Sequence, residues 1–249
     1  LDAHVAHPAQ VFAGVFQHRF DAAIQTTRQL VEEGALGQLL TANMRLRCHR
    51  PDSYYADDWH GTWAREGGSV LINQAIHFVD ALSWIAGGAA SIHAVWDNLA
   101  HPGVMETEDT LVAALRYRNQ ALGTFSVTCG SHDNWSHMLS LEGDRGTIEL
   151  HAGRPAAVLF KDEADAQRAR RMYDQTSDPD GVAAARSYYG TGHAALIADV
   201  VDAVREGRAP FVTGEQAAHA VRIVLAAYES ARQDKAIELP ADDAVTATG

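Results

Sequence analysis

The chain of 249 residues contains no uninterrupted apolar run that approaches the roughly 18 residues needed by a membrane-spanning helix. Cysteine is also scarce. Cys48 and Cys129 show no spacing typical of a disulfide framework or a zinc site, and they are compatible with a reducing compartment. Residues 1–10 have neither the basic segment nor the apolar segment of a secretory signal peptide. We therefore expect a cytoplasmic protein.

Positive charge is in short supply as well. Lys and Arg number 20 against 32 Asp and Glu, which gives a formal net charge of −12. A field of this sign repels nucleic-acid phosphates and anionic membrane surfaces, so we expect neither as a partner, and a neutral small substrate fits better. Hydrophobic residues make up 47% of the chain and charged residues 21%, a balance typical of an ordinary globular protein.

The strand, glycine-rich turn and helix of a dinucleotide-binding unit are missing too. Gly190-Thr191-Gly192-His193-Ala194-Ala195 has a similar spacing, but it follows residues 186–189 (Arg-Ser-Tyr-Tyr) rather than a buried strand. We interpret it as a turn that leads into a helix, and we assign no cofactor-binding residue in this chain.

Histidine, by contrast, is abundant, with 13 residues. The pairs His4/His7 and His132/His137 are the closest approaches to a metal-binding spacing, but neither is accompanied by the cysteines or carboxylates of a known site. We therefore assign no metal, and the histidines need another explanation.

Periodicity and capping residues predict the helices. In the last of them, Thr213 and Gln216 have capping-box spacing, and an apolar stripe is expected to comprise Val221, Val224, Leu225 and Tyr228. The predicted helices are Asp21–Glu33, with Gly34 at its end, Val70–Ala86, His193–Arg205 and Glu215–Ala231.

Segments of alternating polarity predict strands, and Asn, Asp and Gly residues supply the turns. A long loop rich in Tyr and Trp runs from Cys48 to Gly68, and a polar excursion with room for one helix spans Lys161–Ser187. The predicted strands are Val11–Phe16, Leu39–Arg47, Ile92–Trp96, Thr110–Tyr117, Ala121–Cys129, Met138–Glu142, Thr147–Leu150 and Ala156–Phe160.

This arrangement of elements indicates an α+β fold, a large and mostly antiparallel sheet with helices on one face. The other face is expected to serve oligomerisation, because the central strands lack the charged alternation of a solvated face. We expect residues 1–16 to be the remnant of a preceding domain, residues 17–240 to form the main domain, and residues 241–249 to form a flexible tail.

The helix predicted over Val70–Ala86 carries the most informative pattern. Asn73, His77 and Asp80, followed by Trp84, are spaced i, i+4, i+7 and i+11 within an otherwise apolar sequence. A helix this apolar is expected to be buried on nearly all sides. Its polar stripe must therefore contact polar partners or face a cleft. The pattern alone leaves two interpretations open: a hydrogen-bonded core histidine beside a buried amide, or a catalytic pair.

The segment Gly67-Gly68-Ser69-Val70-Leu71-Ile72-Asn73-Gln74-Ala75-Ile76-His77 resembles the active-site helix of the glucose–fructose oxidoreductase/inositol dehydrogenase (Gfo/Idh/MocA) family. Further segments resemble the same family in the same order along nearly the whole chain. They are Gly14-Val15-Phe16-Gln17-His18-Arg19-Phe20-Asp21, Glu32–Gly37, Trp59-His60-Gly61-Thr62-Trp63, Gly143–Thr147, Glu206–Pro210 and Tyr228–Ala231.

The resemblance implies a function. This chain would be the C-terminal substrate-binding domain of an NAD- or NADP-dependent enzyme that oxidises a hydroxyl of a sugar, sugar derivative or cyclitol. His77 would be the general base, because a neutral imidazole with a pKa near 7 suits that task. Asn73 stands where many relatives have Asp, and its amide can orient but cannot take up a proton. The family's catalytic Lys, in a Glu-Lys-Pro segment of the nucleotide domain, is absent from this sequence.

We expect the chain alone to be inactive and to bind no cofactor. The competing hypothesis is a non-catalytic carbohydrate-binding or oligomerising module, whereas a metal-dependent sugar hydrolase would need a carboxylate–histidine cluster that the sequence does not show. Relatives commonly pair through the open sheet face, which implies a dimer or tetramer. The residues expected to bind a small polyhydroxylated substrate are His18, Arg19, Arg47, His49, Trp63 and His193.

Overall fold

The computed structural model describes all residues except 1–3, 5, 8–9, 177–189 and 241–249. Its centre is an eight-stranded sheet in the order β7-β6-β5-β1-β4-β3-β2-β8, in which only β1 and β4 run parallel. The strands are β1 (Leu39–His49), β2 (Ala89–Asp97), β3 (Thr110–Tyr117), β4 (Leu122–Thr128), β5 (Gly130–Gly143), β6 (Gly146–His151), β7 (Arg154–Phe160) and β8 (Ile237–Glu238).

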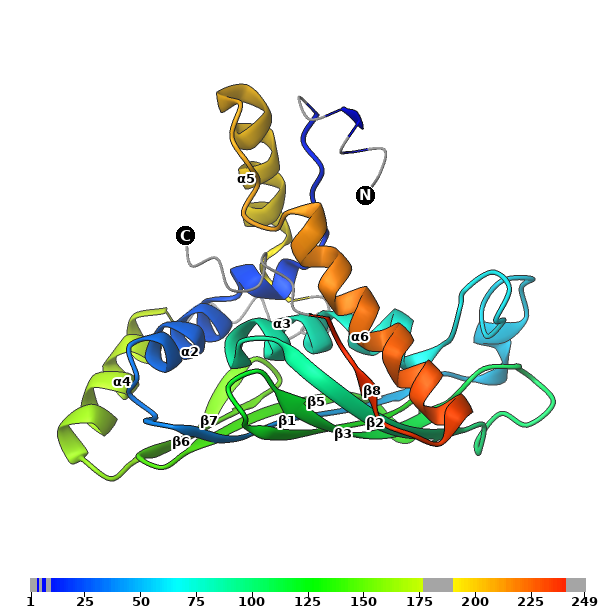
Figure 1. The fold of residues 1–249 in the computed structure, drawn as a ribbon, viewed down its shortest axis with the longest axis horizontal. Helices are drawn as coiled ribbons and strands as arrows, with labels where there is room; N and C mark the ends of the chain where they lie inside the picture. Colours follow the sequence, from blue (N-terminus) through cyan, green and yellow to red (C-terminus); the bar gives the residue numbers. More distant parts are fainter. Residues whose placement is uncertain (1–3, 5, 8–9, 177–189, 241–249) are drawn as a thin grey trace.

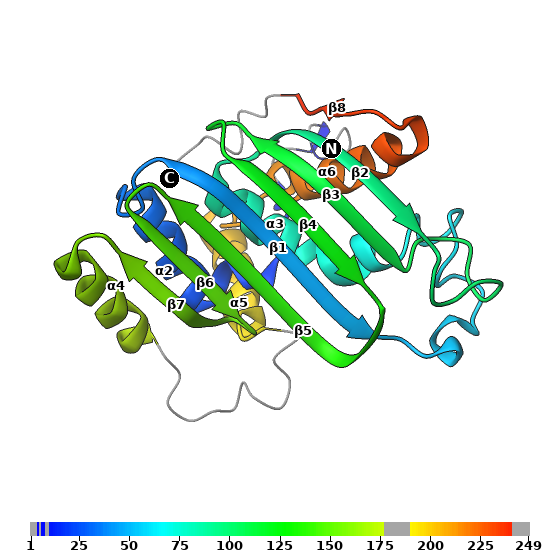
Figure 2. The same ribbon diagram turned by 90° about the horizontal axis from the view of Figure 1, so that it is seen from below.

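Helices gather on one side of this sheet and leave the other side open (Figures 1 and 2). One helix, α5, projects away from the sheet beside the N-terminal segment. The helical elements are η1 (Gln17–Phe20), α2 (Ala22–Glu32), η2 (Asp52–Tyr55), η3 (Val70–Ala75), α3 (Ile76–Ala86), α4 (Glu163–Thr176), α5 (His193–Glu206) and α6 (Gly214–Gln233). The expected α+β architecture is confirmed. Among the described residues, no helix combines the length and apolar character needed to cross a membrane.

The core lies between the helices and the inward face of the sheet. Along β1, Ala42, Met44 and Leu46 are buried, whereas their neighbours face the open side. The central strand β4 behaves in the same way, with Phe125 and Val127 buried. Period-2 alternation therefore decides which side chains meet the helices.

The last long helix, α6, begins as expected. The Thr213 hydroxyl accepts from the Gln216 amide, and the Gln216 side chain accepts from the Thr213 amide, which completes a capping box. The expected apolar stripe was wrong in part, because Val221 and Leu225 are exposed while Val224 is buried. The helix packs instead through the face that carries Ile223, Val224, Ala227 and Tyr228.

Two other expectations need correction. No strand forms over Val11–Phe16. A single bridge joins Ala13 to Thr213, because no continuous ladder of backbone partners lies beside this segment. Strand β5 begins at Gly130 rather than Met138, since its polar first half pairs with the end of β1 without showing apolar alternation. The polar stretch after Lys161 does contain one helix, α4, and its later part and the expected tail lie outside the described residues.

Candidate functional site

The helix that carries Asn73 and His77 is not a continuous α-helix. Val70–Ala75 is π-helical, and α-helical geometry starts at Ile76. Glu108 holds its beginning: the buried carboxylate accepts from the amides of Ser69 and Leu71 at 3.0–3.1 Å and from the Tyr228 hydroxyl at 2.7 Å. Single π-helical turns recur at functional sites because they change the direction in which side chains leave the helix.

The π-helical turn separates Asn73 from the expected stripe. The Asn73 amide donates to the Glu66 carboxylate, whose other oxygen accepts from the Gly61 amide at 2.5 Å. Asp80, two turns further on, is buried and forms a bidentate pair with Arg19 at 2.6 and 2.7 Å. Asn73 and Asp80 therefore have different partners. We attribute this to the larger number of residues per turn in the π-helical part.

His77 lies in a cluster of aromatic rings on the helix side of the sheet. Its ring meets His18 edge to face at 6.2 Å between centroids, and it meets Phe16 at 5.7 Å. Phe78 stacks between His18 at 4.6 Å and His137 at 4.3 Å. His77 Nδ1 is buried and has no hydrogen-bond partner among the described residues. A polar atom in this state is available to a ligand.

Burial shifts the titration of this cluster. It lowers the pKa of His77 to about 4, with smaller contributions from His18 and His193. It lowers the pKa of His137 to about 3, again with His18 acting in the same direction. Both rings are therefore neutral at neutral pH, the form in which an imidazole nitrogen accepts a proton. The expectation of a pKa near 7 for His77 was wrong, because burial disfavours the charged form of its ring.

His18 is held by a carboxylate. Its Nδ1 lies 2.5 Å from Asp21 Oδ2, while Asp21 Oδ1 accepts from the Thr191 amide and hydroxyl at 2.9 and 3.1 Å. The Nε2 atom of His18 is buried and has no partner among the described residues. Asp21 thus fixes the orientation of the ring and leaves Nε2 as the nitrogen that a ligand can use.

The turn Gly190-Thr191-Gly192 packs on this pair and leads directly into α5, as expected. A Cβ at Gly190 would stand 2.7 Å from the His18 ring, and one at Gly192 would stand 1.9 Å from the Gln17 carbonyl oxygen. The glycines therefore serve the contact between this turn and η1. A dinucleotide pyrophosphate does not fit between this turn and η1.

The remaining expected substrate residues lie in different places. Arg19 forms a buried salt bridge with Asp80. Arg47 is on the open side of the sheet, paired with Asp133 at 3.3 Å, because it alternates with the inward Leu46 and Cys48. Trp63 packs on Trp96, Tyr228 and Arg232, with its indole nitrogen donating to the Glu106 carbonyl oxygen.

The other two expected substrate residues are His193 and His49. His193, the first residue of α5, is near enough to His77 to act on its pKa. His49 ends β1 and lines a cavity of about 510 Å³ with Arg50, Tyr54 and Trp135. His18, His77 and His193 are therefore brought together, whereas Arg19, Arg47 and Trp63 are not brought to this cluster.

Sequence reasoning missed His137. Its partner across the ladder is Leu46, an inward residue, so His137 also points to the helix side. The alternation of His137 with Leu139 and Leu141 carried this signal. The residue was instead weighed only as a metal ligand paired with His132, which is exposed. Among the described residues, no three His, Cys, Asp or Glu side chains are placed to hold a metal ion.

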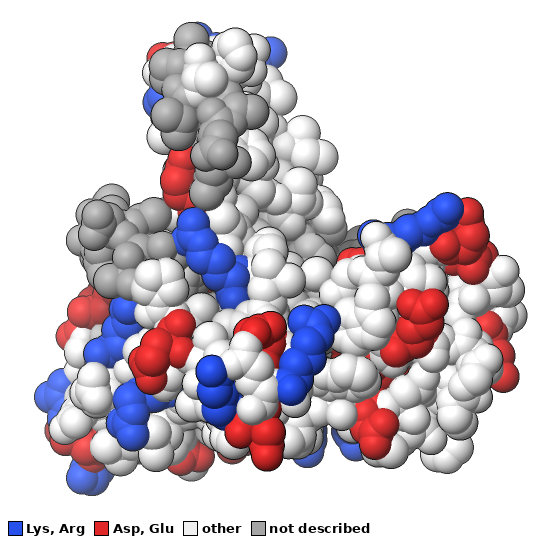
Figure 3. All heavy atoms as spheres, turned by 45° about the vertical axis from the view of Figure 1, so that its right-hand side comes forward, with Lys and Arg blue, Asp and Glu red and all other residues white. Residues whose placement is uncertain are grey.

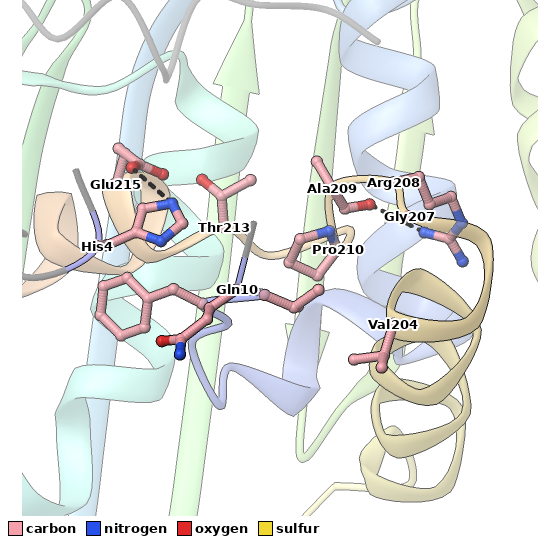
Figure 4. A pocket seen from close by; sticks show the side chains of 11 residues that line it. His4, Gln10, Val204, Gly207, Arg208, Ala209, Pro210, Thr213 and Glu215 are labelled. Carbon is pink, nitrogen blue, oxygen red and sulfur yellow. Dashed lines mark hydrogen bonds and ion pairs between the residues drawn. The ribbon is translucent and has the colours of Figure 1, made fainter. Parts of the chain in front are cut away.

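A larger cavity, of about 800 Å³, lies elsewhere. It opens between the N-terminal segment and the connection from α5 to α6, where His4 faces Glu215 at 3.8 Å (Figure 4). None of the clustered histidines lines it. Figure 3 shows acidic and basic side chains mixed over one side of the molecule, so the net charge is not concentrated there in one patch.

Fold and site together define an α+β domain that holds a cluster of histidines on the helix side of a large, mostly antiparallel sheet. A family model described as the C-terminal alpha/beta domain of an oxidoreductase family (Gfo/Idh/MocA) matches residues 28–239. The chain belongs to this family, as the resemblance predicted.

Similarity to individual dehydrogenases supports this family assignment. The chain is 22% identical over 237 residues to a myo-inositol 2-dehydrogenase of Thermotoga maritima, covering 92% of this chain and 64% of that protein. It is 24% identical over 192 residues to a levoglucosan dehydrogenase of Pseudarthrobacter phenanthrenivorans, covering 67% and 49%. The WlbA dehydrogenase of Bordetella pertussis, solved with NADH and UDP-GlcNAcA, superposes with a TM-score of 0.78 at 30% identity, covering 92% and 64%. The chain thus spans less than two thirds of each of these relatives.

Proposed function

We propose that this chain is the substrate-binding domain of an NAD(P)-dependent oxidoreductase that oxidises a hydroxyl of a sugar, sugar derivative or cyclitol. The observation that carries the proposal is His77, a neutral imidazole whose buried Nδ1 has no hydrogen-bond partner in the part of the chain that the structure describes. The named relatives act on inositol and levoglucosan or are solved with a nucleotide sugar, which supports a polyhydroxylated substrate.

His77 is the general base in this proposal. Burial keeps its imidazole unprotonated at neutral pH, so it can accept the proton of a substrate hydroxyl. Asn73 is a positioning residue, because its amide binds Glu66 and contributes no titratable group. His18 offers Nε2 to a further substrate hydroxyl, and Asp21 sets the direction in which it does so.

The test is His77→Ala in the enzyme that contains this chain. Removing a general base lowers kcat by about 10²–10⁴. We expect this loss with an unchanged circular-dichroism spectrum, and His132→Ala, an exposed histidine, serves as the matched control. A His77→Ala enzyme that keeps most of its turnover would favour the alternative, a non-catalytic carbohydrate-binding or oligomerising module.

The dinucleotide, and the hydride transfer that it supplies, belong in this proposal to a part of the enzyme outside this chain. The isolated chain should therefore neither bind NAD(H) nor oxidise a polyol. Isothermal titration with NADH tests the point directly. A micromolar affinity for this 249-residue chain would refute it.

We also propose that the open face of the sheet is buried between subunits (Figure 2). Its central strands present the uncharged side chains of Val112 and Ala114 from β3 and of Thr124 and Ser126 from β4, with Arg116 of β3 and Arg45 of β1 beside them. Leu122, at the start of β4, is 51% exposed on the same face. A sheet face of this kind packs well against a second sheet.

A further inference from the structure

We propose that the cavity beside the histidine cluster is a subsite for an anionic group, a carboxylate or phosphate, on the sugar substrate, and that Arg50 binds it. The inference rests on the proposed function, because it names the class of substrate that the domain receives. The cavity has about 510 Å³ and is lined by His49, Arg50, Pro51, Ser53, Tyr54, Asn134 and Trp135.

Arg50 is held rigidly in this cavity. Its backbone amide donates to the Cys129 carbonyl oxygen at 3.0 Å, and its own carbonyl oxygen accepts from His101 Nε2 at 2.8 Å. His101 is in turn fixed by the buried Asp109 carboxylate, 3.2 Å from its Nδ1. Rotation of the chain at Arg50 is therefore restricted before any ligand binds, which lowers the entropy lost on binding.

The side chain of Arg50 is also oriented. Its guanidinium carbon lies 5.1 Å from the centre of the Tyr54 ring and 5.6 Å from that of Trp135, with Nη1 donating to the His49 carbonyl oxygen at 3.1 Å. Its Nε is buried and has no hydrogen-bond partner among the described residues. A planar cation that is half-buried with an unused donor favours an anion with two oxygen atoms.

The cavity adjoins the histidine cluster, because residues of its aromatic walls contact residues of the cluster. The indole nitrogen of Trp135 donates to His137 Nδ1 at 3.2 Å, and the Trp135 ring lies 6.5 Å from Phe78. On the other wall, the Tyr54 hydroxyl accepts from Gln74, three residues before His77, at 3.4 Å. Trp135 therefore lines the cavity on one side and contacts His137 and Phe78 of the histidine cluster on the other.

The net charge of −12 does not oppose this. Charges that act through solvent are screened beyond about 8 Å at physiological salt, whereas a bidentate pair with Arg50 forms at contact. Among the described residues, the side chains lining the cavity carry no carboxylate. Local charge and total charge thus have opposite signs.

The test is binding to the 249-residue chain, without dinucleotide, of glucose, glucuronate, glucose 6-phosphate and inorganic phosphate. Affinities are measured by nuclear magnetic resonance, with the Trp135 indole resonance as the local reporter. We expect at least one of the two charged sugars to bind about tenfold or more tightly than glucose. The stronger of the two identifies carboxylate or phosphate as the preferred group.

In Arg50→Gln, the charged sugar should bind with nearly the same affinity as glucose. In Arg50→Lys, the charged sugar should keep only part of its higher affinity. Arg205→Gln, at an exposed arginine in the last turn of α5, is the control and should change nothing. Equal binding of charged and neutral sugars, an unchanged affinity in Arg50→Gln, or phosphate binding as tightly as the sugar phosphate would each overturn the subsite. Because no turnover is measured, these failures leave the His77 experiment unaffected.

Discussion

The hydroxyl of Tyr228 lies directly over Gly68, so close that a Cβ at position 68 would stand 2.1 Å from the oxygen. The same hydroxyl donates to the buried Glu108 carboxylate, which holds the start of the helix that carries His77. Gly68 also has φ of +154°, a conformation that few side chains tolerate. Gly68, just before the helix that carries His77, is thus required by packing and by backbone conformation at once.

Gly68→Ala should therefore destabilise the fold strongly. Strain at this φ and the clash with Tyr228 together predict a loss of roughly 2–4 kcal/mol in the free energy of unfolding. Urea denaturation measures the change. Gly103→Ala is the matched control, because Gly103 also has positive φ but its Cβ would meet nothing within 4 Å. If the two variants lost equal stability, the contact with Tyr228 would not be the cause.

Acid should destabilise the chain through its buried histidines. The pKa values of His77 and His137 are lowered to about 4 and about 3 in the folded state, from an ordinary value of 6.5. Between these values the unfolded chain binds more protons, so stability is lost as pH falls from 6.5 toward 4. One pKa unit corresponds to about 1.4 kcal/mol. The titration of His77 alone should therefore lower the free energy of unfolding by on the order of 3 kcal/mol between pH 6.5 and the acid limit.

The free energy of unfolding, measured against pH, checks this expectation. His77→Gln and His137→Gln should each flatten the acid slope, because a residue that cannot titrate cannot contribute to it. His132→Gln replaces an exposed histidine of the same strand as His137 and is the matched control. A slope that stays the same in both buried variants would contradict the assignment.

Asp21→Asn should loosen both His18 and the start of α5. Asn retains one oxygen acceptor but removes the charge that both the His18 ring and Thr191 use. Buried hydrogen bonds to a charged group contribute about 1.5–3 kcal/mol, so a loss of that order is expected. Hydrogen exchange at the Thr191 amide should accelerate in parallel.

The chain offers a matched control for this change. Asp57 and His60 form a pair with the same separation of three residues and the same 2.5 Å distance, but Asp57 is exposed. Asp57→Asn should therefore leave stability and exchange as in the original protein. Equal effects of the two substitutions would show that burial of the Asp21–His18 pair is unimportant.

Ser126→Lys should separate subunits while leaving each folded. Ser126 faces the open side of the sheet in the middle of β4, whereas the adjacent Val127 is buried in the core. Light scattering should give a multiple of the 26.9 kDa chain mass for the original protein and one chain mass for the variant. Gln167→Lys, on exposed helix α4, should not change the assembly. A monomeric mass of the original protein at micromolar concentration would exclude this interface.

Local sequence determined the secondary elements, the α+β class and the helix that bears His77. Alternation of polar and apolar residues, the capping box of Thr213 and Gln216, and the turn into α5 all depend on neighbours in the chain. These patterns can be recognised without knowing which elements pack together. They did not reveal the π-helical turn before His77, because Glu108 and Tyr228, which hold it, lie far along the chain.

Only the tertiary structure decided which histidines meet. His137 joins the cluster because the register of β5 against β1 turns it toward the helices, and Arg47 leaves the site because its own strand turns it to the open face. Asp21 holds His18 and a turn 170 residues away. Such contacts depend on strand pairing and helix packing between distant segments, and a periodic pattern shows that a residue faces inward without showing what it faces.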